Sequence, residues 1–180
     1  MKIYITRHGQ TDSNKERRLM GQKINDSLNE VGIKQSEELA KSLLKEEFDI
    51  VFSSPLKRAL ETSEIIKKQL NIPIITDKRL TERDFGSLSG KSWDEIENSS
   101  PWTTRENDLA QKYDYSSFGG ETAKDVEKRL IDFLEYLKKE YSDKKILIVA
   151  HGGIAKLLQH IYRDKEVFTP KNCTVSSFEI

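Results

Sequence analysis

The chain has 180 residues, of which 36% are hydrophobic and 33% charged, which is enough for one substantial hydrophobic core. Its 30 Lys and Arg residues are balanced by 30 Asp and Glu residues, so the composition argues against a cationic nucleic-acid binder. The single cysteine excludes an intrachain disulfide framework. Charge comes too early for a signal peptide and no apolar run approaches about 20 residues, so we expect a cytoplasmic protein without a membrane span.

Predicted strands and helices alternate along the chain. Five segments rich in apolar or β-branched residues are predicted strands, at residues 2–6, 48–53, 72–76, 145–150 and 174–180. The segment at 145–150 is almost continuously apolar, as expected of a central parallel strand that is buried on both faces. Pro73 lacks a backbone N–H, so the segment at 72–76 is expected to be either an edge strand or an irregular segment that approaches the sheet.

Four helical patterns lie between these strands. The second helix is expected to begin at Ser54 as N-cap and Pro55 as first helical residue, and to run to about Leu70. Thr122 and Asp125 approximate a capping box at the start of the third. The stripes expected to be buried are Leu39, Ala40, Leu43 and Leu44 in the first helix, Val126, Leu130, Phe133, Leu134 and Leu137 in the third, and Ile154, Leu157, Leu158 and Ile161 in the last.

Residues 91–120 interrupt the alternation with polar sequence and scattered aromatic residues. We expect a short lid insertion here, within one domain that spans residues 1–180. Its aromatic side chains either line the mouth of a site or form the insertion's own small core; they are Trp93, Trp102, Tyr113 and Tyr115. The alternating elements predict an α/β fold, a three-layer sandwich with a mostly parallel central sheet and helices on both faces.

Two of the three histidines follow predicted strands and precede glycine. His8 comes after the strand at 2–6, and His151 after the strand at 145–150. Because ligands gather at the carboxyl ends of strands in open α/β sheets, we expect both imidazoles to face one crevice. His160 lies in an amphipathic helical pattern and is expected to have no such role.

Two arginines are predicted to share that crevice. Arg7 directly precedes His8, and Arg58 lies in the first turn of the helix after the strand at 48–53. Two guanidinium groups grip a tetrahedral dianion well, and helix N-termini after the strands add N–H donors. The pattern therefore indicates a phosphate-binding pocket.

The ordered blocks that carry these residues resemble the signature of the histidine phosphatase superfamily, the phosphoglycerate mutase-like group. The resemblance covers nearly the whole chain. The blocks are Arg-His-Gly-Gln-Thr at 7–11, Asn14, Gly21-Gln22, residues 28–35, residues 53–62, residues 80–90, residues 119–122 and Val-Ala-His-Gly-Gly at 149–153.

The resemblance implies a covalent mechanism in which His8 attacks phosphorus and becomes a phosphohistidine. Arg7, Arg58 and His151 would hold the phosphoryl oxygens, and Glu82 would protonate the leaving alkoxide and then activate water. The residues implied to bind phosphate or substrate are Asn14, Gln22 and Gly152. The scheme requires no metal and no cofactor. Glu121 is expected to be structural, and Cys173 is expected to be a small core residue.

We expect a phosphatase for a small phosphorylated metabolite. A cofactor-dependent phosphoglycerate mutase is the alternative, but the insertion is short and supplies only Arg105 for a substrate anion. Arg83 resembles the mutase pattern, so it either touches a substrate charge or is a solvated loop residue. A non-catalytic phospho-ligand binding module is the second alternative. The expected partners are a small phosphorylated substrate but no nucleic acid or membrane, and the chain is expected to be a monomer or homodimer.

Overall fold

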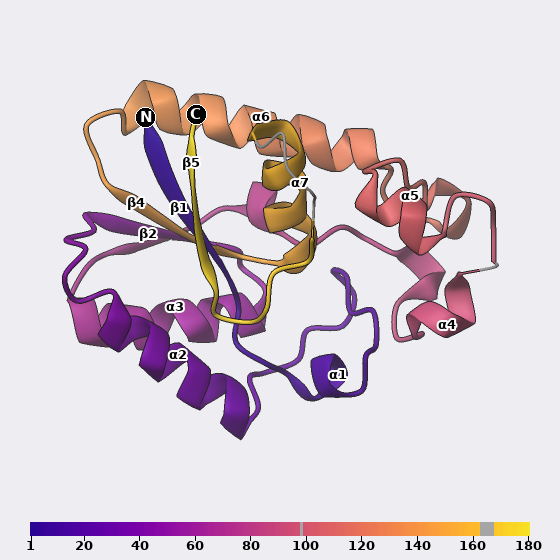
Figure 1. Cartoon of the computed structure of the whole chain (residues 1–180), viewed down its shortest axis with the longest axis horizontal. Helices are drawn as coiled ribbons and strands as arrows, with labels where there is room; N and C mark the ends of the chain where they lie inside the picture. Colours follow the sequence, from indigo (N-terminus) through magenta and orange to yellow (C-terminus); the bar gives the residue numbers. More distant parts are fainter. Residues whose placement is uncertain (98, 163–167) are drawn as a thin grey trace.

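The computed structural model describes residues 1–97, 99–162 and 168–180. Its centre is one sheet of five strands in the order β3-β2-β4-β1-β5, visible in Figure 1. The strands are β1 (Lys2–Arg7), β2 (Ile50–Ser53), β3 (Ile74–Thr76), β4 (Ile146–Ala150) and β5 (Val175–Glu179). The first four are parallel and β5 runs antiparallel to β1, so the mostly parallel sheet is confirmed. The strand that follows Pro73 lies at an edge, as that proline indicated.

Helices cover both faces of this sheet. On one face lie α2 (Glu30–Ser42) and α3 (Lys57–Leu70), and on the other α6 (Ala123–Glu140) and α7 (Gly152–Tyr162) (Figure 1). Side chains of β4 point alternately to the two sides: Leu147 and Val149 pack in the core cluster of α2 and α3, while Ile148 packs in the cluster of α6 and α7. Burial on both faces explains why this strand is apolar throughout, and the predicted sandwich is confirmed.

The third predicted helix agrees closely with the structure. Thr122 caps α6 through a capping box with Asp125, and the predicted apolar stripe of this helix is buried. The first helix differs at its end, because α2 stops at Ser42 and leaves Leu44 50% exposed. A helix that ends there carries Leu44 beyond the buried stripe.

The expected start of the second helix is wrong. Helix α3 begins at Lys57 rather than Pro55, and its N-cap, Leu56, makes no side-chain hydrogen bond. The Ser54 hydroxyl instead lies 2.7 Å from Nε2 of His151 and accepts from the Leu56 N–H at 3.3 Å. The Ser54 hydroxyl therefore contacts His151, at the end of the neighbouring strand β4, and does not cap the helix.

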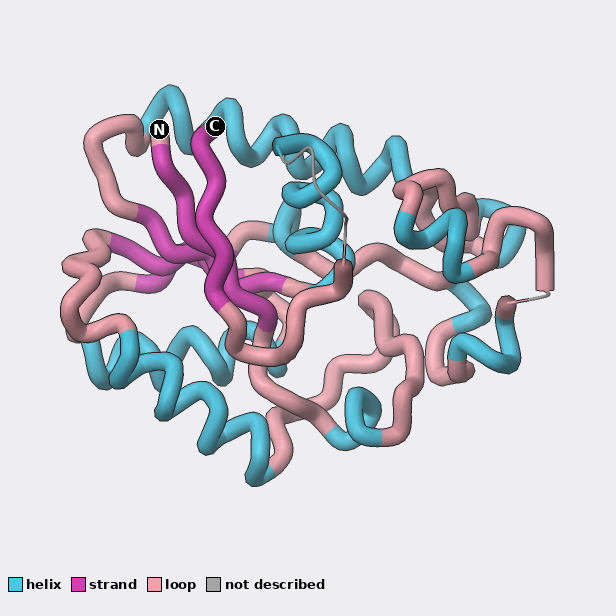
Figure 2. The backbone as a smooth tube through the Cα atoms, in the orientation of Figure 1, coloured by secondary structure: helices cyan, strands magenta, loops and turns pink. Residues whose placement is uncertain are grey.

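The connection between β3 and α6 is built from short helices and loops, seen at one end of the molecule in Figure 2. Residues 91–120 carry α4 (Trp93–Ile96), α5 (Arg105–Leu109) and the 3₁₀ turn η3 (Ser116–Phe118). Tyr113 and Tyr115 stack at 5.2 Å and are buried, so they belong to the insertion's own core. Trp102 is 54% exposed, and none of the helices in the described ranges is long and apolar enough to cross a membrane.

Candidate active site

His8 and His151 lie side by side. Strands β1 and β4 are parallel neighbours with Arg7 opposite Ala150, so the residues that follow them meet at one edge of the sheet. The ring centroids of the two histidines are 5.2 Å apart, and both side chains are buried. The predicted juxtaposition therefore follows directly from strand order.

The hydrogen bonds of His8 assign its tautomer. Nδ1 lies 2.7 Å from the carbonyl oxygen of Gly9, which has no proton to give, so Nδ1 carries the proton and donates. Nε2 is then unprotonated and accepts from Nε of Arg58 at 3.2 Å. Burial, with the positive charges of Arg58 and Arg7, lowers the pKa of His8 well below its usual range. His8 thus presents a neutral ring nitrogen with a lone pair, the state that a nucleophile needs.

Arg58 is held at three points. Besides its contact with His8, it donates from Nη1 to the Ile24 carbonyl at 3.0 Å and from Nη2 to the Gly21 carbonyl at 2.9 Å. Burial lowers the pKa of Arg58 to about 10, which leaves the guanidinium charged at neutral pH. A charged group fixed this way beside Nε2 is preorganised to stabilise a phosphoryl group there.

Arg7 approaches the same place from β1. Its Nη1 donates to the Pro170 carbonyl at 3.0 Å, while its Nε is buried with no partner among the described residues. Burial lowers the pKa of Arg7, and the Glu82 carboxylate opposes that shift. Arg7 therefore keeps a buried donor available at the strand end.

His151 stands behind His8 and is fully buried. Burial, with the charges of Arg58 and Arg7, lowers the pKa of His151 well below its usual range, so the ring is neutral. Its Nδ1 has no partner among the described residues. Since the Ser54 hydroxyl accepts from Leu56, it is free to donate to Nε2 of His151, which would leave the ring proton on Nδ1 as a further donor.

Glu82 is fixed at the start of α7. One carboxylate oxygen accepts from the Gly153 N–H at 3.1 Å and the other from the Arg83 N–H at 3.0 Å. A Cβ on Gly153 would lie 2.2 Å from Glu82 Oε1, so only glycine leaves room for the carboxylate here. Arg129 of α6 holds the loop from behind by donating to the carbonyls of residues 79, 81 and 82.

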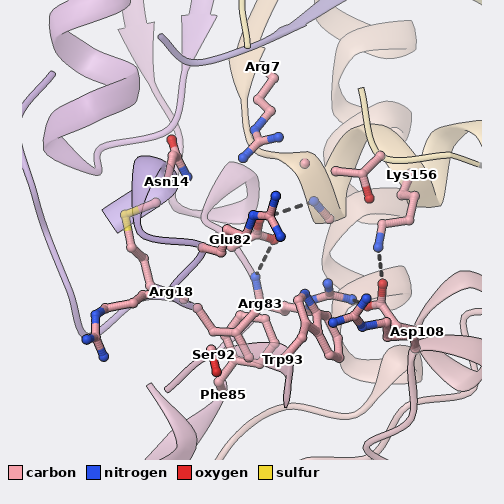
Figure 3. A pocket seen from close by; sticks show the side chains of 18 of the residues that line it. Arg7, Asn14, Arg18, Glu82, Arg83, Phe85, Ser92, Trp93, Asp108 and Lys156 are labelled. Carbon is pink, nitrogen blue, oxygen red and sulfur yellow. Dashed lines mark hydrogen bonds and ion pairs between the residues drawn. The ribbon is translucent and has the colours of Figure 1, made fainter. Parts of the chain in front are cut away.

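These residues line a cavity of about 490 Å³, seen from close by in Figure 3. Arg7, His8, Arg58 and Glu82 contribute to its wall together with Asn14 and Gly152, whereas His151 lies beneath the surface. Oδ1 of Asn14 accepts from the Thr11 N–H and from Asn172, which leaves its amide NH₂ as donor.

Gln22 is the predicted site residue that the structure does not bring to this cavity. Its amide donates to Glu121 at 3.1 Å, and its side chain is not part of the cavity wall. Glu121 also accepts from the Asp84 N–H and from Arg129, which fits the structural role expected of it. Gln22 therefore belongs to the hydrogen-bond network around Glu121, which also holds the backbone of Asp84 and the side chain of Arg129.

Sequence reasoning missed a buried ionic cluster on the cavity wall, formed by Arg83, Asp108 and Lys156. Arg83 is not the solvated residue that one alternative expected: it is 4% exposed and forms an ion pair with Asp108. Lys156 of α7 also pairs with Asp108, which the insertion contributes from α5 (Figure 3). Lys156 lies off the predicted apolar stripe of α7, so the sequence carried no signal for the burial of either Lys156 or Asp108.

We searched the described acidic, histidine and cysteine side chains for a metal site. Within residues 1–97, 99–162 and 168–180, no group of three such side chains is placed to hold a metal ion. Cys173 lies 3.7 Å from the Ser36 hydroxyl, and burial raises the pKa of its thiol to about 11, so it is not a nucleophile at neutral pH.

Comparison with known proteins gives one consistent result. The family model for the histidine phosphatase superfamily (branch 1) matches residues 3–180. A relative from Arabidopsis thaliana called metal-independent phosphoserine phosphatase is 36% identical over 163 residues, covering 87% of this chain and 66% of that protein. A Bacillus subtilis relative called uncharacterized phosphatase PhoE is 33% identical, covering 84% of this chain and 72% of its own length. The chain thus spans about two thirds of the plant relative.

The solved structures agree with the sequence relatives. A mycobacterial glucosyl-3-phosphoglycerate phosphatase superimposes with a TM-score of 0.85 at 25% identity, covering 98% of this chain and 91% of that one. The sheet order and flanking helices described above are therefore shared with solved structures.

Proposed function

The chain belongs to the histidine phosphatase superfamily, and on that basis we propose that it is a phosphatase, a phosphomonoesterase that acts through a phosphohistidine at His8. The observation that carries the proposal is the tautomer of His8. The Gly9 carbonyl directs the unprotonated Nε2 toward Arg58, where a bound phosphoryl group would meet both a lone pair and a positive charge.

The reaction proceeds in two displacements. Nε2 of His8 forms a bond to phosphorus while the ester P–O bond breaks, and Glu82 gives a proton to the departing alkoxide. Glu82 then takes a proton from water, whose oxygen attacks phosphorus and releases inorganic phosphate and neutral His8. Arg7, Arg58, Asn14 and the buried Nδ1 of His151 supply donors to the phosphoryl oxygens in both steps.

The mutase alternative has less support. Arg105, the insertion's arginine for a substrate anion, is 55% exposed and pairs with Asp94 at 2.5 Å and with Glu97 at 3.7 Å. Its charge is thus already matched at the surface. Returning the phosphoryl group to a second hydroxyl requires that the substrate stay bound, and the arginine expected to hold it is already paired with two carboxylates.

The test compares wild type with His8→Ala on p-nitrophenyl phosphate and 3-phosphoglycerate, with EDTA present. We expect wild type to release phosphate without a metal, and the variant to release none while keeping its melting temperature. Acid-labile, base-stable phosphate on wild-type protein would identify the intermediate.

Three outcomes would contradict the proposal. Residual activity in His8→Ala would remove His8 as the nucleophile, and formation of 2-phosphoglycerate in the presence of 2,3-bisphosphoglycerate would make the protein a mutase. Tight phosphate binding without turnover would indicate a binding module.

A further inference from the structure

Arg83 and Lys156 lie where the leaving group of a substrate would depart. Arg83 directly follows Glu82 in the chain, and Lys156 lies one helical turn beyond Gly153, whose N–H binds the Glu82 carboxylate. Both residues line the cavity, and neither is used by the proposed mechanism. An anionic group on the alcohol half of a substrate would approach this pair of cations.

The two cations already share one anion, so the buried cluster keeps one net positive charge. Asp108 places one carboxylate oxygen against Arg83 and the other against Lys156, and the three residues are between 2% and 4% exposed. The rings of Phe85 and Tyr113 lie 5.0 and 4.7 Å from the Arg83 guanidinium and cover it further. A substrate anion would reach these cations only by displacing Asp108, which would leave a buried carboxylate without a counter-ion.

Two exposed arginines of the cavity wall also form ion pairs. Arg18 pairs with Glu16 at 2.9 Å, and Arg105 pairs with Asp94. Arg7 and Arg58, by contrast, make no ion pair in the described part of the chain and donate to carbonyl oxygens and to His8. Of the cavity-wall cations in the described ranges, Arg7, Arg58 and the exposed Arg17 thus make no ion pair, and the first two lie beside His8 at the phosphate end.

We propose that Asp108 is a built-in counter-ion that selects for phosphomonoesters whose alcohol half carries no second anion. The inference rests on the proposed phosphatase function and names the substrate class of the same site. Its substrates are phosphorylated alcohols such as sugar or polyol phosphates, and esters with a carboxylate on the carbon beside the ester-bearing carbon are discriminated against. Asp108 belongs to the insertion, so the insertion sets this selectivity.

Two matched pairs of esters test the proposal. Phosphoserine differs from phosphoethanolamine by one carboxylate, and 3-phosphoglycerate differs from glycerol 3-phosphate by a carboxylate in place of a hydroxymethyl group. We expect wild type to have the higher kcat/KM for the carboxylate-free member of each pair. Asp108→Asn keeps the shape of the side chain but frees both cations, and we expect it to shift each ratio about tenfold toward the carboxylate-bearing ester.

The control is Glu106→Gln, which removes an exposed carboxylate from the same helix as Asp108 but outside the cavity wall, and it should leave both ratios unchanged. Lys156→Gln serves if Asp108→Asn does not fold. It should leave the wild-type ratios within about twofold, because Arg83 still holds Asp108. A selective loss of phosphoserine turnover in Lys156→Gln would show instead that Lys156 binds the substrate carboxylate.

The proposal is overturned if wild type prefers the carboxylate-bearing esters, or if Asp108→Asn shifts the ratios less than threefold. Either result would leave the phosphatase function standing, provided that turnover of the esters still requires His8. Absence of any His8-dependent hydrolysis would count against the proposed function itself.

Discussion

Replacing Gly153 by alanine would put a methyl group where the Glu82 carboxylate now lies. The added Cβ would be 2.2 Å from Oε1 and 3.1 Å from the carboxyl carbon, whereas ordinary contact begins at 3.4 Å. The carboxylate must therefore retreat by about 1 Å, and a displacement of that size at a catalytic group costs about 10²-fold in rate. Alanine also favours a helix over glycine by about 1 kcal/mol, so α7 should not be destabilised.

The assay is kcat/KM for an alkyl phosphate and for p-nitrophenyl phosphate, with a melting curve for each variant. We expect Gly153→Ala to lose about 10²-fold on the alkyl ester, whose alkoxide needs a proton, and clearly less on the nitrophenyl ester, whose leaving group does not. In a double variant with Glu82→Gln, Gly153→Ala should lower kcat/KM little further, because both substitutions impair the same function, proton donation by Glu82. Wild-type kinetics in Gly153→Ala, or equal losses on both esters, would refute the assignment of Glu82 as the acid.

Three other substitutions or conditions probe the same site. Burial lowers the pKa values of His8 and His151, so below about pH 6.5 the unfolded chain binds more protons than the native one. The free energy of unfolding should therefore fall on acidification by up to about 1.4 kcal/mol per pH unit for each histidine. Urea unfolding from pH 7.5 to 5 measures this slope, and His8→Asn should reduce it. Arg58→Lys keeps a charge but loses the fork that contacts His8 and two carbonyls, so kcat/KM should fall about 10²-fold, and an unchanged value would contradict the proposed clamp. Arg129→Met should lower kcat more than it raises KM, because Arg129 positions the loop of Glu82 without entering the cavity; Arg129→Lys should recover part of the loss.

The sequence predicts the features that depend on local pattern and strand order. The apolar run of β4 and the stripe of α6 are predictable because burial on a known face dictates their period. The meeting of His8 and His151 is predictable because both follow parallel strands. Features that depend on contacts between distant segments cannot be predicted from local pattern and strand order.

Ser54 shows why such features escape a local reading. Its position before Pro55 is typical of an N-cap, but its hydroxyl is used by His151, which is nearly a hundred residues away in sequence. Lys156 is similar: it lies off the predicted apolar stripe of α7, so the helical period gives no reason to expect it buried, and its partner from α5 accounts for a cation at this buried position. These residues are explained by their contacts with distant segments, and the residue pattern of a single helix does not contain that information.

The placement of β1 has a consequence for how the protein folds. This strand is made first, yet its two neighbours in the sheet are β4 and β5, and Ile3 pairs with Ile146. During synthesis both of its edges therefore stay unpaired, and its buried side chains, Ile3 and Ile5, have no sheet to join, while β2 and β3 can already pair. Contacts this distant along the chain form slowly, and an exposed strand edge is prone to association with other chains. We expect the nascent chain to depend on chaperones during this interval, and His8 to acquire its partner from β4 only in the last stage of folding.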